Sequence, residues 1–284
     1  MKRLALFLVA CGASTPSAEM HESPTYLELR ASHQTRLTRR GPIADEWPDD
    51  PVPEGAERVT YPSGELELWG WLSIPEGAEA APALVYLHGD RFLQARDWAL
   101  LAPFRDAGFA VLTPTLRGRN GNPGVHELLL GEVDDARAAV RYAKAHPAID
   151  AERVYLIGHS MGGATAALAS LFPNDRPAMS ASIGGIYSRG TFASWSRGGD
   201  SNLVPFAASD PDEVAVRLFP LHVDQLQVPH VAYMGDQERR IQQNAREAQA
   251  RAPANLFEVH VVPGTHMSAR APALADFLDR VASR

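Results

Sequence analysis

The residues best suited to chemistry lie in the stretch Gly158-His159-Ser160-Met161-Gly162-Gly163. The preceding run 153–157 contains Val154, Leu156 and Ile157 and predicts a buried strand, and the alanine-rich run 164–172 predicts a helix. Strand, G-x-S-x-G and helix together are typical of a nucleophile elbow, in which glycines leave room around an exposed serine hydroxyl. The following helix directs its N-terminus at developing negative charge. The stretch therefore predicts Ser160 as a nucleophile; without this context the same letters would mark only a glycine turn.

Five further motifs accompany the elbow. They are Leu87-His88-Gly89, Thr113-Pro114-Thr115-Leu116-Arg117-Gly118, Val133-Asp134-Asp135, the segment from Gly235 to Ile241, and Gly264-Thr265-His266. With them, the chain from about Arg58 onward resembles an α/β-hydrolase, most similar to the catalytic domain of the prolyl oligopeptidase family and its dienelactone-hydrolase-like relatives. The resemblance implies a serine hydrolase that needs no cofactor, and it does not fix a substrate.

A serine hydroxyl needs a base to take its proton before it can attack. In the fold that the chain resembles, this base is a histidine late in the chain. His266 follows the last expected strand and precedes the last expected helix, so we expect it to be the base. His159 adjoins Ser160 in sequence, and we expect it to point away from the nucleophile.

An acid should orient the imidazole of His266. Two candidates, Asp236 and Glu238, follow the strand expected over 228–234. The family usually has its acid three residues after a glycine, with an apolar residue three further on. Gly235, Glu238 and Ile241 match that spacing and favour Glu238, although the family more often has aspartate there. Asp236 remains the alternative, and either residue could instead cap the helix that begins near Arg239.

Two backbone N–H groups should form the oxyanion hole. We expect one from Met161, which follows the nucleophile, and the other from Asp90, in the loop after Leu87. Relatives often have glycine at the second position, and a carboxylate near a developing oxyanion would disfavour the transition state. Asp90 therefore keeps open a second hypothesis, in which the domain is a catalytically weak or inactive binding module. We expect His88 to brace this loop.

The loop Arg117-Gly118-Arg119-Asn120-Gly121 has two interpretations. Bidentate arginine could contact a substrate carboxylate or the leaving group, or the loop could be a buried brace. No motif has the spacing of a catalytic zinc site such as H-E-x-x-H, and we expect no metal.

The composition is that of an ordinary globular chain, with 284 residues, 45% hydrophobic and 21% charged. A net charge of -7, without a basic run with interleaved aromatic residues, argues against nucleic-acid binding. The expected partner is a small-molecule ester or a short peptide substrate.

The N-terminus resembles a bacterial lipoprotein signal. A basic start, Met1-Lys2-Arg3, precedes the apolar run 4–10 and the single cysteine, Cys11. We expect a signal-like segment over 1–10, lipidation of Cys11 and an extracytoplasmic, membrane-anchored protein. A soluble exported or cytoplasmic protein that merely keeps this segment is the alternative.

Residues 11–55 have few large apolar side chains and predict a flexible linker, which leaves 56–284 as the catalytic domain. Strands are expected over 58–61, 65–74, 83–87, 109–113, 153–157, 179–183, 228–234 and 256–262, and helices over 96–107, 131–146, 164–172, 239–251 and 271–281. The first two strands predict an antiparallel hairpin. The later alternation predicts an α/β fold, a mostly parallel sheet with helices on both faces.

Residues 187–227 interrupt the alternation and predict a small cap over the site. A surface connection is the alternative. Together these features predict a serine hydrolase that cleaves an ester or a peptide/amide bond through an acyl-enzyme on Ser160.

Overall fold

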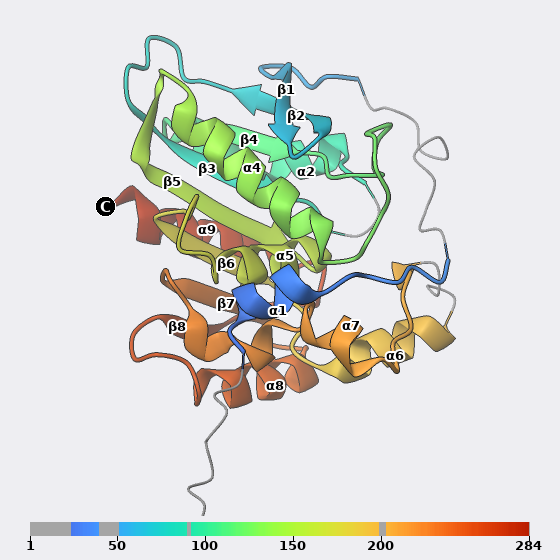
Figure 1. Ribbon diagram of the computed structural model, residues 1–284. Coiled ribbons are helices and arrows are strands. Elements are labelled where there is room, and N and C mark those ends of the chain that lie inside the picture. The colour runs from blue at the N-terminus through green and yellow to red at the C-terminus, as the bar shows by residue number, and fades with distance from the viewer. Residues whose placement is uncertain (1–23, 40–50, 90–91, 199–202, 284) are drawn as a thin grey trace, which may run out of the picture.

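The computed structural model describes residues 24–39, 51–89, 92–198 and 203–283, which are built around one eight-stranded sheet (Figure 1). The strands lie in the order β1-β2-β4-β3-β5-β6-β7-β8. The pairs β1–β2 and β2–β4 are antiparallel and the other neighbours are parallel. The strands are β1 (Glu57–Ser63), β2 (Leu66–Ser73), β3 (Ala81–Leu87), β4 (Ala110–Pro114), β5 (Ile149–His159), β6 (Met179–Ile183), β7 (His230–Gly235) and β8 (Phe257–Val262). The predicted hairpin and mostly parallel sheet are confirmed.

Helices cover both faces of the sheet, and each face has its own apolar core. Alternate residues of β3 divide between them, since Val85 and Leu87 belong to one core and Leu84 and Tyr86 to the other. The first core also takes apolar residues of α4 (Gly131–Ala145), α5 (Met161–Ala169) and α8 (Arg239–Gln249). The second takes those of α2 (Ala95–Leu100), α3 (Ala102–Asp106) and α9 (Arg270–Ala282).

The prediction of a single helix over 96–107 is wrong. The chain bends at Leu101, where α2 ends and α3 begins, and Pro103 occupies the first turn of α3. Proline has no N–H for the helical ladder and restricts the residue before it, so the two helices separate here.

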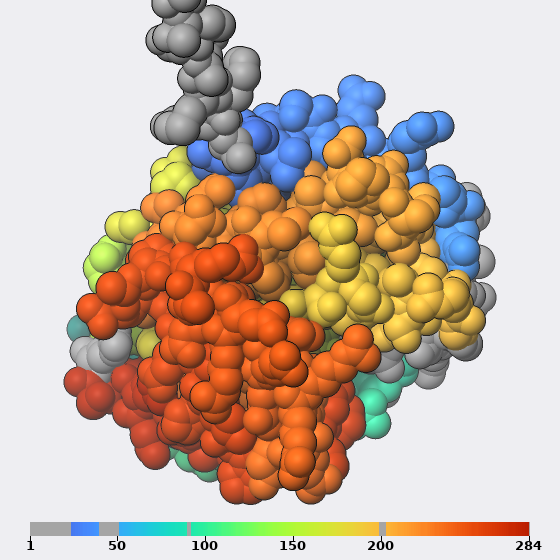
Figure 2. Space-filling view, turned by 90° about the horizontal axis from the view of Figure 1, so that it is seen from below, coloured from blue at the N-terminus to red at the C-terminus, as the bar shows by residue number. Residues whose placement is uncertain are grey.

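The linker prediction is wrong for residues 24–39, which pack against the domain. α1 (Tyr26–Ser32) places the Tyr26 ring in the core, 5.8 Å from the ring of Phe172. Arg30 forms an ion pair with Asp134 at 2.7 Å. Figure 2 shows this N-terminal segment in blue, against the orange surface of the cap. Residues 1–23 and 40–50 lie outside the described residues, and so do Cys11 and the signal-like segment.

The segment between β6 and β7 folds as short helices. They are α6 (Arg189–Arg197), α7 (Pro211–Ala215) and the 3₁₀ turns η3 (Phe219–Leu221) and η4 (Val223–Gln225). The N-terminal segment holds this cap from outside, because the N–H groups of Thr38 and Arg39 donate to the carbonyl of Pro205. Among the described helices, none is both long and apolar enough to span a bilayer.

Candidate active site

Ser160 lies at the sharp turn between β5 and α5. Its backbone has φ 55° and ψ -116°, a strained conformation for a residue with a side chain, and its N–H donates to the carbonyl of Ile183 at 2.7 Å. A Cβ on Gly158 would lie 2.3 Å from the backbone of Gly162, so the first glycine of the motif permits the close approach of strand and helix. Such a conformation costs about 1–3 kcal/mol and persists only where the surrounding structure enforces it.

His266 and Glu238 meet at the carboxyl ends of β8 and β7. Nδ1 of His266 lies 2.7 Å from Oε1 of Glu238, and the N–H of Gly235 donates to Oε2 at 2.8 Å. Burial opposes ionisation of Glu238, but the hydrogen bonds from His266 and Gly235 outweigh it, so its pKa lies below the ordinary value. Glu238 is nearly buried, whereas the side chain of His266 is 39% exposed. A buried carboxylate thus fixes one nitrogen of an accessible imidazole.

Gly184, directly after β6, makes room for this pair. Its φ is +60°, and an added Cβ would lie 2.7 Å from Nδ1 and Cε1 of His266. It would also lie 3.5 Å from Oε1 of Glu238. A side chain at position 184 would therefore displace the imidazole.

Asp236 has a different place. Its carboxylate accepts from the N–H of Gly264 at 3.0 Å and so braces the turn that precedes His266. The structure brings Glu238 to the imidazole and Asp236 to the backbone of the same loop.

His159 supports His266 from the other side. Its Nε2–H donates to the backbone carbonyl of His266 at 2.9 Å, and the two ring centroids are 4.8 Å apart. Burial, reinforced by the neighbouring His266, lowers the pKa of His159 to about 4, so its ring is neutral at pH 7. The prediction that His159 points away from the nucleophile missed this support, since His159 lines the same cavity as Ser160. Only the adjacency to Ser160 marked it in the sequence.

Of the two predicted oxyanion donors, the structure describes Met161. Met161 begins α5, and Gly89 ends the described part of the β3 loop, where an added Cβ would lie 3.2 Å from Cβ of Ser160. Asp90 lies outside the described residues. His88 is buried, and its Nδ1 lies 3.1 Å from the carbonyl of Gly89, as expected of a loop brace. Burial lowers the pKa of His88 to about 4.

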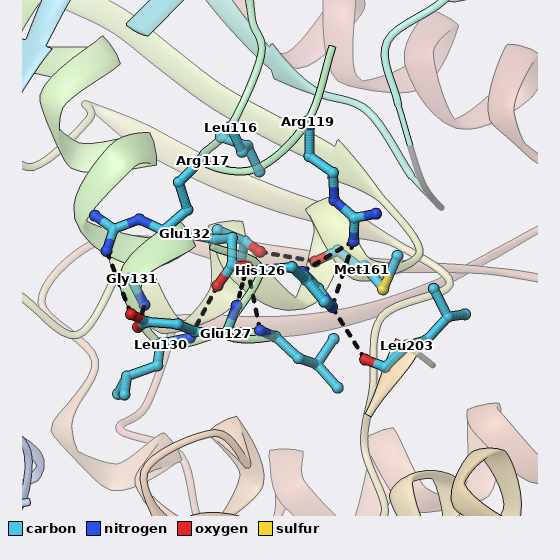
Figure 3. A network of polar contacts seen from close by, with 12 residues as sticks. Leu116, Arg117, Arg119, His126, Glu127, Leu130, Gly131, Glu132, Met161 and Leu203 are labelled. Carbon is cyan, nitrogen blue, oxygen red and sulfur yellow. Dashed lines mark hydrogen bonds and ion pairs between the residues drawn. The ribbon is translucent and has the colours of Figure 1, made fainter. Parts of the chain in front are cut away.

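Arg117 and Arg119 brace the interior (Figure 3). Nε and Nη2 of Arg117 donate to the two oxygens of buried Asp135 at 2.9 and 2.8 Å. Nη2 of Arg119 lies 2.9 Å from Nδ1 of His126, which itself lies 2.8 Å from Oε1 of Glu132. Neither arginine lines the cavity at Ser160, which favours the brace interpretation.

A cavity of about 270 Å³ opens beside Ser160, Met161 and His266. The cap contributes Trp195 and Leu203, so the predicted contact between cap and site is present. The remaining lining residues are Gly89, Phe92, Gln94, Arg96, Asp97, His159, Met267 and Arg270. The cavity combines apolar and aromatic side chains with polar and charged ones, as a concave site for a small molecule can.

The sequence model of the Alpha/beta hydrolase family matches residues 84–282. The chain belongs to this family. Uncharacterized peptidase YtmA of Bacillus subtilis is 26% identical over 133 residues, which are 45% of this chain and 50% of that protein. The chain thus aligns with about half the length of this curated relative.

Solved structures share the fold at low sequence identity. An acylaminoacyl peptidase from Pyrococcus horikoshii has a TM-score of 0.64 at 16% identity, covering 79% of this chain and 41% of the peptidase. An acetyl xylan esterase from Paenibacillus sp. R4 has a TM-score of 0.63 at 17% identity, covering 90% and 92%. Est1E from Butyrivibrio proteoclasticus, solved with ferulic acid, has a TM-score of 0.63 at 18% identity, covering 80% and 100%. Family and neighbours support a hydrolase.

Proposed function

We propose that the protein is a serine hydrolase that works through an acyl-enzyme on Ser160. One observation carries the proposal: His266, which Glu238 orients, and Ser160 at the strained elbow line one accessible cavity. A nucleophile, an oriented imidazole and a space for the reacting group are the parts that acyl transfer needs.

Each residue has one role in this reaction. Nε2 of His266 takes the proton of the Ser160 hydroxyl while Oγ attacks the acyl carbon. Glu238 holds the imidazole in the required tautomer and stabilises the imidazolium. The N–H of Met161, at the start of α5, donates to the oxyanion. His266 then gives its proton to the leaving group, and a water activated by the same nitrogen hydrolyses the acyl-enzyme. The second oxyanion donor that we propose is the N–H of Asp90.

The scissile bond is an ester or a peptide/amide bond, and we favour the ester. The structural neighbours include both esterases and a peptidase. The cap over the site is short, and Trp195 and Leu203 add an apolar wall suited to an acyl chain or a small alcohol.

Steady-state kinetics with 4-nitrophenyl acetate and butyrate, compared with aminoacyl and dipeptidyl arylamides, test this function. We expect ester turnover that disappears in Ser160→Ala while the far-UV circular dichroism stays unchanged. Equal turnover in Ser160→Ala would contradict the acyl-enzyme. Efficient arylamide cleavage with little esterase activity would contradict the preference for esters.

We also propose that Cys11 is lipidated and anchors the hydrolase outside the cytoplasm. The cysteine follows a short apolar run, and stable anchoring is expected of a multiply acylated N-terminus. After expression of the full gene in a bacterium, wild type should fractionate with membranes and Cys11→Ser should not. Identical fractionation of the two would contradict the anchor.

A further inference from the structure

The charged groups of the cavity at Ser160 are unequally compensated. Nη1 of Arg270 lies 3.1 Å from Oδ1 of Asp97, and Nε of Arg270 donates to the carbonyl of Met267 at 3.1 Å. Oδ2 of Asp97 accepts from the N–H of Gln94 at 3.2 Å. Both members of this ion pair are largely buried. The charge of Arg270 is therefore matched within the protein.

Arg96 lines the same cavity, but its charge is not paired as that of Arg270 is. It lies in the first turn of α2, its side chain is exposed, and no hydrogen bond or ion pair engages it among the described residues. Asp97, the carboxylate next to it in sequence, already pairs with Arg270. One positively charged side chain thus lines the cavity at Ser160 without a paired carboxylate among the described lining residues.

The loop before Arg96 is held in place by two hydrogen bonds. The side-chain amide of Asn120 donates to the carbonyl of Leu93 at 3.0 Å, and its oxygen accepts from the N–H of Leu93 at 2.9 Å. Phe92, Trp195 and Leu203 also line this cavity and supply apolar surface. Among the described lining residues, a ligand here meets an apolar wall and, in Arg96, a guanidinium that no carboxylate pairs.

We propose that Arg96 binds a carboxylate on the substrate, so that the preferred substrates are acyl compounds whose chain carries a carboxylate away from the scissile bond. The guanidinium presents two parallel N–H donors that match a carboxylate. The apolar wall takes the methylene chain between the carboxylate and the acyl carbon. This inference rests on the proposed acyl-enzyme mechanism.

Two ethyl 4-nitrophenyl alkylphosphonates of equal chain length test it, both uncharged at the phosphonate group, one ending in a carboxylate and one in a methyl group. Each should phosphonylate Ser160 and release one equivalent of 4-nitrophenolate. We expect wild type to react faster with the carboxylate probe. In Arg96→Gln the ratio of the two rate constants should fall about tenfold, as expected from loss of one charge-assisted contact. The rate with the methyl probe should stay within about twofold.

Arg197→Gln is the matched control, because it removes the same charge from an exposed position of α6 that does not line the cavity. An unchanged ratio in Arg96→Gln, or an equal fall in Arg197→Gln, would overturn the carboxylate subsite and leave the hydrolase proposal standing. Failure of both probes to release 4-nitrophenolate from wild type would instead remove the acyl-enzyme, and the subsite with it.

Discussion

Two histidine–glutamate pairs in this protein have nearly equal distances from nitrogen to carboxylate oxygen but different surroundings. Nδ1 lies 2.7 Å from the carboxylate in His266–Glu238 and 2.8 Å in His126–Glu132. His126 is 2% exposed, and its Nε2 lies 3.0 Å from the carbonyl of Leu203 (Figure 3). His266 is 39% exposed, and its described side-chain hydrogen bond uses Nδ1 alone. A carboxylate partner therefore does not by itself make a base; the second nitrogen must also be accessible.

The largest expected effect comes from exchanging each histidine for glutamine. His266→Gln should lower kcat by a factor on the order of 10⁶, because serine and base act as a unit. His126→Gln should keep kcat within about tenfold of wild type and instead lower the free energy of unfolding by about 1–3 kcal/mol, since buried partners lose their contacts. Ester kinetics and urea unfolding measure the two effects. Comparable losses of kcat in both variants would contradict the distinction.

Removing the charge of the acid should have the next largest effect. Glu238→Gln leaves the shape but not the carboxylate that orients His266, and we expect kcat to fall by a factor on the order of 10⁴. Asp236→Asn is the control on the same loop, because the described hydrogen bond of the Asp236 carboxylate is with the backbone N–H of Gly264. A severe loss confined to Asp236→Asn would reverse the assignment.

Gly184→Ala should displace the imidazole without touching its charge. The added Cβ would lie 2.7 Å from the His266 ring, and misplacement of a base by about 1 Å costs about 10²-fold in rate. Gly77→Ala is the matched control, with φ +70° and open space around the added Cβ. Both carry backbone strain, so equal effects on kcat would show that strain, not the clash, is responsible.

The buried pair should appear in the pH dependence of stability, the smallest effect of the series. Burial opposes ionisation of Glu132, but His126 and backbone N–H groups outweigh it, so the pKa lies below its ordinary value of 4.5. A carboxyl with a depressed folded-state pKa adds stability above about pH 4.5 and loses it as the pH falls further. Glu132→Gln should therefore lower Tm at pH 7 and flatten its decline below pH 4.5. The exposed control Glu76→Gln should keep the wild-type dependence of Tm on pH. An unchanged dependence in Glu132→Gln as well would contradict this account.

The sequence predicted the elements that carry the site better than the contacts that hold the site in place. Ser160 follows from a local strand–glycine–helix pattern, and the Gly235–Glu238 spacing marked the carboxylate that meets His266. The packing of α1 could not be predicted in this way, because Tyr26 and Arg30 find their partners more than 100 residues later. No local periodicity of apolar residues marks such a segment in the sequence.

The contacts that hold His126 also depend on residues far away in the sequence. Its contact with Glu132 is local, but its second nitrogen depends on Leu203, 77 residues away in the cap. The contact of His159 with the backbone of His266 spans 107 residues. Local pattern thus identified the candidate catalytic groups, and long-range packing decided which histidine stayed accessible.

Labelling with a fluorophosphonate probe tests the central claim most directly. The purified protein should be labelled at one site, identified by mass spectrometry as Ser160, with labelling lost in Ser160→Ala and strongly slowed in His266→Gln. His126→Gln should be labelled at nearly the wild-type rate. Labelling of wild type no stronger than that of Ser160→Ala would contradict the account and favour a binding module that keeps the hydrolase fold.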